Sequence, residues 1–355
     1  MMGFTDKKRI VNRKKIIRSA ALHLVLLAGS AIFILPFAWL LVTSVKQADQ
    51  VFKYPPEWIP TRQVNVSIDG KEYGLSILKR EGRNVRVAEI ADVEDGKWIR
   101  ILAGQPGAGR KLLVARPSLR PVRKFGMNWD NYSRALDFMP KETHKGLLCL
   151  WNTVYITALS ILGTVLTSSL VAYSFARLNW PGRDVLFGVL LATMMLPQAV
   201  TMVPVFLIFC QLGWVDTLRP LWVPSFLGGA FAIFLLRQFF LTIPTDLEDA
   251  AKIDGCPYFM TFWKIMLPLI KPALAAITII TFISSWNNFM GPLIYINSPE
   301  KMPLSYALQL FQNAHNTEYG MLMAMSTLFM LPVLVVFFLA QKYFIEGIAL
   351  TGIKG

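Results

Sequence analysis

The sequence predicts an all-α polytopic membrane protein with six transmembrane helices and a small β-rich domain inserted in the first external loop. The 355-residue chain is 54% hydrophobic but only 16% charged, whereas soluble domains carry about 25% charged residues. Six apolar runs have spanning length, since about 20 apolar residues cross a bilayer. One polar stretch between the first two runs instead alternates apolar and polar residues, which is typical of strands.

The chain begins with a basic segment, residues 1–19, followed by an apolar run at 20–45. A signal peptide has the same order, but this run is too long for one and lacks a small-residue cleavage site. We therefore expect a retained first helix with a cytoplasmic N-terminus, because basic residues mark the inner side of a membrane. The net charge of +14 then reflects topology and not nucleic-acid binding.

Residues 46–145 form a polar loop that we expect on the external side. Its part at about 62–123 contains two turn signals, Asp69-Gly70 and Asp95-Gly96, each flanked by alternating apolar residues. We interpret 62–123 as an inserted β-rich domain. Asn128 to Phe138 follows as a short amphipathic helix before the membrane is re-entered.

A transmembrane core is expected at 146–345. Its apolar runs predict helices at about 147–176, 184–212, 221–243, 271–296 and 321–344. With the first helix this makes six spans, so a C-terminal tail at 346–355 returns to the cytoplasm. The same count places the loop at 244–272 in the cytoplasm, and its lysines agree with the positive-inside rule.

The polar stretch 244–272 is typical of a helix, a turn and a second helix. Thr245 is expected to cap the first helix, with Glu248 completing a capping box. Ala250 and Ala251 give that helix a small-residue face, and Asp254-Gly255 ends it because glycine tolerates the left-handed conformation of a helix stop.

The second helix of this stretch carries large side chains at helical spacing. Phe259, Phe262, Trp263 and Met266 are expected to form one aromatic ridge, which Pro268 and Pro272 follow. An ordinary cytoplasmic loop would explain the polarity but not this pattern, so we interpret the stretch as a docking surface.

Uncharged polar residues inside the spans are the candidates for a solute path. The richest cluster contains Ser285, Trp286, Asn287 and Asn288, where amides and an indole suit a hydroxyl-rich solute. Hydrogen bonding between helices explains such residues equally well. In the third run, Met194, Met195, Pro197 and Gln198 mark a place where the helix can bend.

The sequence contains no recognisable catalytic, phosphate-binding or metal-binding motif. Its three cysteines and three histidines are scattered, so no metal site, disulfide framework or catalytic residue is expected. We expect no cofactor in this chain. No span carries a well-centred charge of the kind ion-coupled carriers use, which indicates that energy enters from another protein.

The stretch 244–272 resembles the signature loop of the permeases of ABC importers, which reads EAA-x-x-x-D-G and continues to a leucine-proline pair. The matching residues are Asp249, Ala250, Ala251, Asp254, Gly255, Phe262, Ile265, Leu267, Pro268 and Pro272. Asp249 departs from the usual glutamate. Residues 179–217, 281–293 and 342–355 resemble the carbohydrate-type members, of the kind represented by the second permease subunit of the maltose transporter. The insert at 62–123 has no counterpart in that pattern.

The resemblance implies the type I ABC-importer permease fold in the inner membrane of a bacterium. It implies a second permease subunit, two ABC ATPase subunits that hold ATP and Mg, an external solute-binding protein and membrane lipid as partners. The loop at 245–268 would be the coupling helix that sits in a groove of the ATPase. The residues of this loop expected to take part in docking are Glu248, Asp249, Ala250, Ala251, Asp254, Gly255, Phe259, Phe262, Leu267 and Pro268. The tail Thr351 to Gly355 would reach between the ATPases.

We therefore expect the permease subunit of an ATP-driven sugar importer. An importer of another small polar solute is the alternative. A standalone secondary carrier would need intramembrane charges or an internal repeat, and a membrane scaffold would leave the docking loop unexplained.

Overall fold

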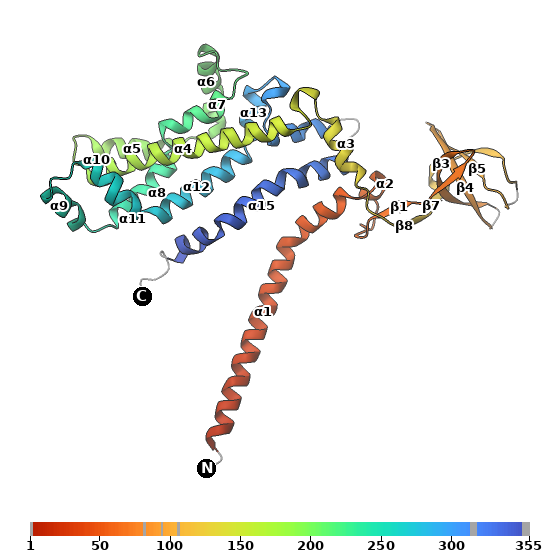
Figure 1. The fold of residues 1–355 in the computed structure, drawn as a ribbon, viewed down its shortest axis with the longest axis horizontal. Helices are drawn as coiled ribbons and strands as arrows, with labels where there is room; N and C mark the ends of the chain where they lie inside the picture. Colours follow the sequence, from red (N-terminus) through yellow and green to blue (C-terminus); the bar gives the residue numbers. More distant parts are fainter. Residues whose placement is uncertain (1–2, 81–82, 94, 105–106, 313–317, 350–355) are drawn as a thin grey trace. The chain divides into compact units, whose positions relative to one another are not determined.

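The computed structural model of the chain describes residues 3–80, 83–93, 95–104, 107–312 and 318–349. It divides into two compact units. The first comprises residues 1–135 and 318–327, and the second comprises residues 136–317 and 328–355. Figure 1 shows the elements of both.

The first unit begins with one long helix, α1 (Gly3–Ser44). The described part of the basic segment, residues 3–19, therefore lies on the same helix as the first span, which is Ile17–Ser44. The short helix α2 (Ala48–Val51) follows. Asn131, at the start of α3 (Asp130–Phe138), donates hydrogen bonds of 2.8 Å to the backbone carbonyls of Ser44 and Lys46. The end of α1 is thus tied to the start of α3.

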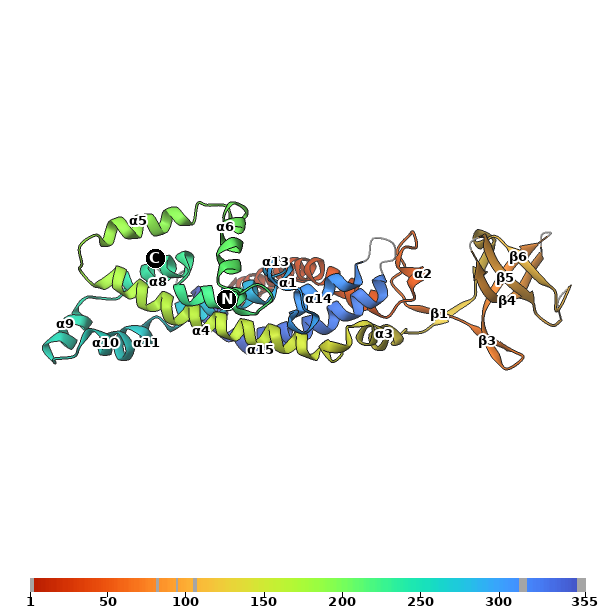
Figure 2. The same cartoon turned by 90° about the horizontal axis from the view of Figure 1, so that it is seen from above.

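The insert is a β domain, as the alternation at 62–123 predicts (Figure 2). Its strands are β1 (Thr61–Gln63), β2 (Asn65–Ile68), β3 (Lys71–Arg80), β4 (Arg83–Val93), β5 (Gly96–Ile101), β6 (Lys111–Val114), β7 (Leu119–Pro121) and β8 (Arg123–Phe125). Strands β2 to β6 pair in sequence order, β7 pairs with β3, and β1 pairs with β8, all antiparallel. Val87, Ile99 and Ile101 lie in its small buried core.

The second unit is helical and packs around α4 (Leu147–Arg177). The other helices are α5 (Arg183–Thr193), α6 (Gln198–Gln211), α7 (Arg219–Trp222), α8 (Ala230–Leu241), α9 (Asp246–Ile253), α10 (Tyr258–Thr261), α11 (Leu267–Leu269), α12 (Lys271–Trp286), α13 (Met290–Tyr295) and α14 (Leu304–Ala307). Shorter turns are η1 (Arg116–Ser118) in the insert, and η2 (Lys141–Thr143), η3 (Val223–Leu227), η4 (Phe262–Met266), η5 (Pro299–Lys301) and η6 (Leu308–Phe311). Side chains of α4, α5, α8, η4 and α12 share one core.

Four helices among the described residues are long and apolar enough to span a membrane, and two bent helix pairs bring the total to as many as six. The expected third span, 184–212, breaks between α5 and α6 with a bend of 101° (Figure 2). The bend falls at Pro197, because proline removes a backbone donor and clashes with the preceding turn. The prediction of a bend at 194–198 is confirmed.

The expected fifth span, 271–296, is also not one helix. Its first helix, α12, ends at Trp286 with Asn287 as the C-cap residue, and α13 begins at Met290. At its other end, α10 to α11 and α12 meet at a bend of 79°, where Pro268 and Pro272 interrupt the backbone hydrogen bonds.

The last helix, α15 (Tyr319–Ala349), runs beyond the expected end at 344. Its spanning part is Tyr319–Leu339. The tail Thr351 to Gly355 lies outside the described residues.

Candidate functional site

The polar stretch between α8 and α12 folds as a helix, a tight turn and an irregular second helix. The first helix, α9, buries the side chains of Glu248 and Ala251 and exposes the rest. Ala250 is exposed. The expected small-residue face is therefore divided, since Ala251 packs inward and only Ala250 is open to another protein.

The expected capping box is wrong. Thr245 has helical backbone angles (φ −68°, ψ −27°) and its side chain makes no capping hydrogen bond within the described chain. Its backbone carbonyl instead accepts hydrogen bonds from the N–H groups of Glu248 and Asp249, at 2.9 and 3.1 Å. A capping side chain needs an extended backbone at its own position, so Thr245 does not cap α9. The side chain of Glu248 turns inward instead and is buried.

The end of α9 follows the sequence prediction. Gly255 has a positive φ of 72°, and its N–H donates to the carbonyl of Lys252 at 3.0 Å. The N–H of Cys256 donates to the carbonyl of Ala251 at 2.9 Å. This pair of bonds is the Schellman stop, which glycine adopts without strain.

A buried ion pair holds α9 against the transmembrane helices. Arg177, at the end of α4, donates from Nε and Nη2 to the carbonyl of Phe240, at 3.1 and 2.5 Å, and from Nη2 to the carbonyl of Ile243. Its Nη1 lies 4.0 Å from Oε2 of Glu248, and both side chains are almost fully buried. Oε1 of Glu248 has no hydrogen-bond partner among the described residues. One guanidinium thus joins α4, the end of α8 and α9.

The expected aromatic ridge is divided between two directions. Phe262 is 1% exposed and Met266 is fully buried, and both belong to the core of the second unit. Phe259 and Trp263 are 68% and 50% exposed and stack on each other with centroids 6.5 Å apart. The backbone at 262–266 is a π-helix, which has more residues per turn than an α-helix. The α-helical spacing read from the sequence therefore does not place these side chains on one face.

The exposed side of this stretch combines apolar and charged side chains. Its large exposed apolar residues are Leu247, Ile253, Tyr258, Phe259, Met260 and Trp263. Lys252 and Asp249 pair at 3.0 Å on the same helix, and the Asp249 carboxylate raises the pKa of Lys252. Asp246, Asp254 and Lys264 are also exposed, so this side carries both charged and apolar side chains.

Leu267 is partly buried and Pro268 is exposed. They lie in α11 beside the 79° bend. Asp254 is the C-cap residue of α9. The part that these three residues take in a contact with another protein remains a prediction.

The polar cluster at the end of α12 is satisfied largely within the chain. Ser285 Oγ lies 3.3 Å from Thr157 Oγ1 on α4, and Trp286 is buried against Phe282. Asn287 donates to the carbonyl of Ile283 at 2.9 Å. Asn288 accepts from the N–H of Gly291 at 3.0 Å. The structure thus gives each of these four residues a packing or hydrogen-bonding role, and their role in a solute path remains a prediction.

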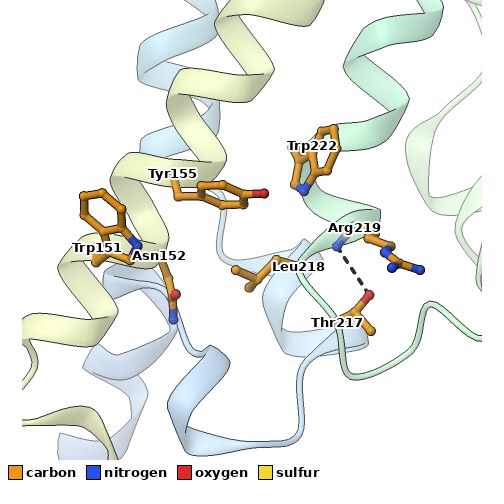
Figure 3. Close-up of a pocket in the computed structure, with 7 residues that line it drawn as sticks. All are labelled: Trp151, Asn152, Tyr155, Thr217, Leu218, Arg219 and Trp222. Atoms are coloured by element: carbon orange, nitrogen blue, oxygen red, sulfur yellow. Dashed lines mark hydrogen bonds between the residues drawn. The ribbon is translucent and has the colours of Figure 1, made fainter.

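Two cavities lie elsewhere in the second unit. One of about 350 Å³ lies between α6 and α13, and Gln198, Thr201, Met202 and Tyr295 contribute to its wall. The other, of about 480 Å³, lies between the start of α4 and α7 (Figure 3). Neither is lined by the cluster at 285–288.

Sequence reasoning missed Arg177 as part of the site. Its position directly after a span marks it as a topology determinant, which is how such arginines usually act. Arg177 belongs to the site because it faces the buried carboxylate of Glu248. The sequence does not show that Glu248 is buried, because this burial depends on the packing of α9 against α4.

Comparison with known proteins agrees with this architecture. The family described as "Binding-protein-dependent transport system inner membrane component" matches residues 164–349. The arabinooligosaccharides transport system permease protein AraQ of Halalkalibacterium halodurans is 34% identical over 262 residues, which are 73% of this chain and 94% of that protein. The lactose transport system permease protein LacG of Rhizobium radiobacter is 35% identical over 200 residues, 56% of this chain and 73% of that protein.

The maltose/maltodextrin transport system permease protein MalG of Escherichia coli (strain K12) is 29% identical over 243 residues, 64% of this chain and 82% of that protein. Among solved structures, a chain of a bacterial ABC transporter involved in the import of the acidic polysaccharide alginate matches with a TM-score of 0.62 and 21% identity. The match covers 94% of this chain and 98% of that chain, and it shows a shared fold.

Proposed function

The chain belongs to the family of binding-protein-dependent transport system inner membrane components, and we propose that it is the permease subunit of an ATP-driven importer of sugars or oligosaccharides. As a member of this family it is a non-catalytic, multi-pass component of the inner membrane.

The exposed side of α9 and α10 is the observation that carries the docking site. Ile253 is 86% exposed, and Tyr258 and Phe259 are also exposed, although they lie in a short polar stretch between spans. Exposed apolar side chains rimmed by charged ones are typical of protein contacts. We assign residues 245–268 as the contact with the ATPase, with Ala250 allowing close approach.

Arg177 supports a role for this loop as a lever. Because its guanidinium binds two carbonyls near the end of α8 and faces Glu248 on α9, a shift of α9 acts on α4 and α8 together. Phe262 and Met266 fix the following segment in the same core. Closure of the ATPases would then rotate these helices as a body and switch the path between outward and inward access, with ATP and Mg on the ATPase and no cofactor in this chain.

The names of several relatives support a carbohydrate substrate. They transport arabinooligosaccharides, lactose and maltodextrin. The cavity between α6 and α13 has the size of a ligand site, and Gln198 and Thr201 offer it hydrogen-bonding groups. It is a candidate for part of the path, beside Ser285, Trp286, Asn287 and Asn288.

The remaining parts of the assembly follow from this role. A second permease subunit, two ATPase subunits and an external binding protein would complete the importer, with both termini of this chain in the cytoplasm. Basic residues at 177, 183, 252 and 264 lie in the loops expected on the inner side, which supports that orientation.

Reconstitution tests the proposal. The importer should be rebuilt in proteoliposomes with its ATPase enclosed and its binding protein outside, and uptake of labelled arabinotriose, lactose and maltotriose should be measured. We expect saturable uptake of at least one sugar that requires both ATP and the binding protein. Equal uptake without ATP, or uptake by this chain alone, would refute an ATP-driven permease.

A further inference from the structure

The cavity between the start of α4 and α7 lies at the boundary of two spans and takes no part in the proposed ATPase contact. Trp151 and Tyr155 line it from the first turns of α4, and Arg219 and Trp222 line it from the first turns of the span Arg219–Leu241 (Figure 3). Its volume of about 480 Å³ is within the range of small-molecule sites. At the end of a span, the surrounding solvent is the headgroup region of the bilayer.

One of the residues that line this cavity, Arg219, carries a cation with no side-chain partner among the described residues. The backbone N–H of Arg219 donates to Thr217 Oγ1 at 3.3 Å, but its guanidinium makes no ion pair or hydrogen bond with any described residue. Asn152, in contrast, is committed to the carbonyls of Glu300 and Met302. Arg219 therefore remains available to an anion, and its planar fork suits phosphate oxygens.

Aromatic rings line the cavity, and the exposed face of α4 that continues from them toward the C-terminus of the helix is apolar. Tyr155 and Trp222 meet edge to face, with centroids 6.4 Å apart, and Trp151 is exposed. From this point exposed side chains continue along α4 at positions 154, 158, 162 and 166, a spacing that places them on one helix face. The cavity thus opens onto an apolar stripe that runs toward the middle of the span.

We propose that this cavity binds an anionic phospholipid, with the headgroup phosphate on Arg219 and one acyl chain along the stripe on α4. Trp151, Tyr155 and Trp222 would lie at the level of the glycerol backbone, where amphipathic rings are favoured. A sugar would use the aromatic rings but leave the apolar stripe uncovered, whereas a phospholipid covers both. The proposal requires the membrane location of the family and not the ATPase contact.

Native mass spectrometry of the complete transporter complex tests this site. The probe is dioleoyl phosphatidylglycerol, added to delipidated complex. Arg219→Gln should weaken its binding by about five- to tenfold, as expected for loss of one cation near the headgroups. Arg110→Gln removes an equal charge from the β insert and should leave binding unchanged. Unchanged binding in Arg219→Gln, or an equal loss in Arg110→Gln, would overturn the site.

Further arms of the experiment separate the lipid from other ligands and from misfolding. Arg219→Lys keeps the charge but not the planar fork, so it should recover part of the binding, which a folding defect would not allow. Glycerol 3-phosphate has the same phosphate but no acyl chains, so it should bind much more weakly than the lipid. Equal binding of glycerol 3-phosphate would exclude the acyl contact, and displacement of the lipid by lactose would assign the cavity to sugar instead.

Discussion

The buried pair of Arg177 and Glu248 gives the sharpest quantitative prediction. Arg177→Met keeps most of the side-chain volume but removes three hydrogen bonds to backbone carbonyls and leaves the Glu248 carboxylate buried without a counter-charge. Removing one partner of a buried pair costs about 3–5 kcal/mol. Glu248→Gln leaves the carbonyl bonds of Arg177 intact, so we expect a smaller loss of about 1–2 kcal/mol.

A double-mutant cycle measures the interaction itself. The separation of 4.0 Å is long for a hydrogen bond, but in a buried site it still allows a coupling energy of about 0.5–3 kcal/mol. The double variant should therefore be more stable than the sum of the two single losses implies. The assay is the free energy of unfolding in mixed micelles, followed by tryptophan fluorescence. Additivity within about 0.3 kcal/mol would show that the two side chains do not interact and would refute the link between α4 and α9.

Three further predictions concern single positions. Gly255→Leu adds a side chain in open space but keeps leucine in a left-handed backbone conformation, so it should lower the free energy of unfolding by about 1–2 kcal/mol. The variant should insert into the membrane normally and co-purify with less ATPase. Full recovery of the ATPase would contradict the role of the turn. Phe262→Ala should lower the free energy of unfolding by about 3–5 kcal/mol. Trp263→Ala should lower it by about 1 kcal/mol or less but weaken ATPase binding. Equal losses of stability in the two variants would show that the aromatic ridge is not divided. Hydrogen bonds from the side chain and backbone of Ser298, with Lys301, hold the pKa of Asp216 well below its usual range, so its contribution to stability should be present above a pH of about 4 and be lost as the pH falls further. Asp216→Asn should remove about 1–3 kcal/mol at neutral pH and flatten this acid dependence, and an unchanged pH profile would contradict the assignment.

The helices and the insert could be predicted because their signals are local. Apolar runs of spanning length and the turns at Asp69-Gly70 and Asp95-Gly96 depend on neighbours in sequence, and the structure places helices and strands there. The stop at Gly255 is equally local, since a Schellman turn involves only six residues. The bend at Pro197 follows from the missing N–H of proline.

The features that the sequence misplaced depend on tertiary contacts. Glu248 has the spacing of a capping box, but a buried cation at Arg177 takes its carboxylate instead. Phe259 and Phe262 are expected on one ridge, but Phe262 packs into the core of the second unit while Phe259 stays exposed. Ala251 is small enough for an intermolecular contact and is used within the chain. In each case the competing interaction comes from α4 or the core, which no local pattern reports.

The Asp216 contacts belong to the same class. Its oxygens accept hydrogen bonds from Asn297, Ser298 and Lys301, about 80 residues away in sequence. These bonds fix two loops at one end of the second unit, and sequence spacing gives no indication of them.

The proposed contact between α9 and the ATPase can be tested by the recovery of the ATPase with the Ile253→Glu variant. This side chain is 86% exposed and makes little contribution to the fold, so the variant should insert and retain the second permease subunit. Leu113→Glu, on the exposed surface of the β insert, is the matched control. We expect Ile253→Glu to lose most of the co-purified ATPase and Leu113→Glu to keep it. ATPase recovery at the wild-type level in Ile253→Glu would contradict the assignment of this loop as the coupling contact.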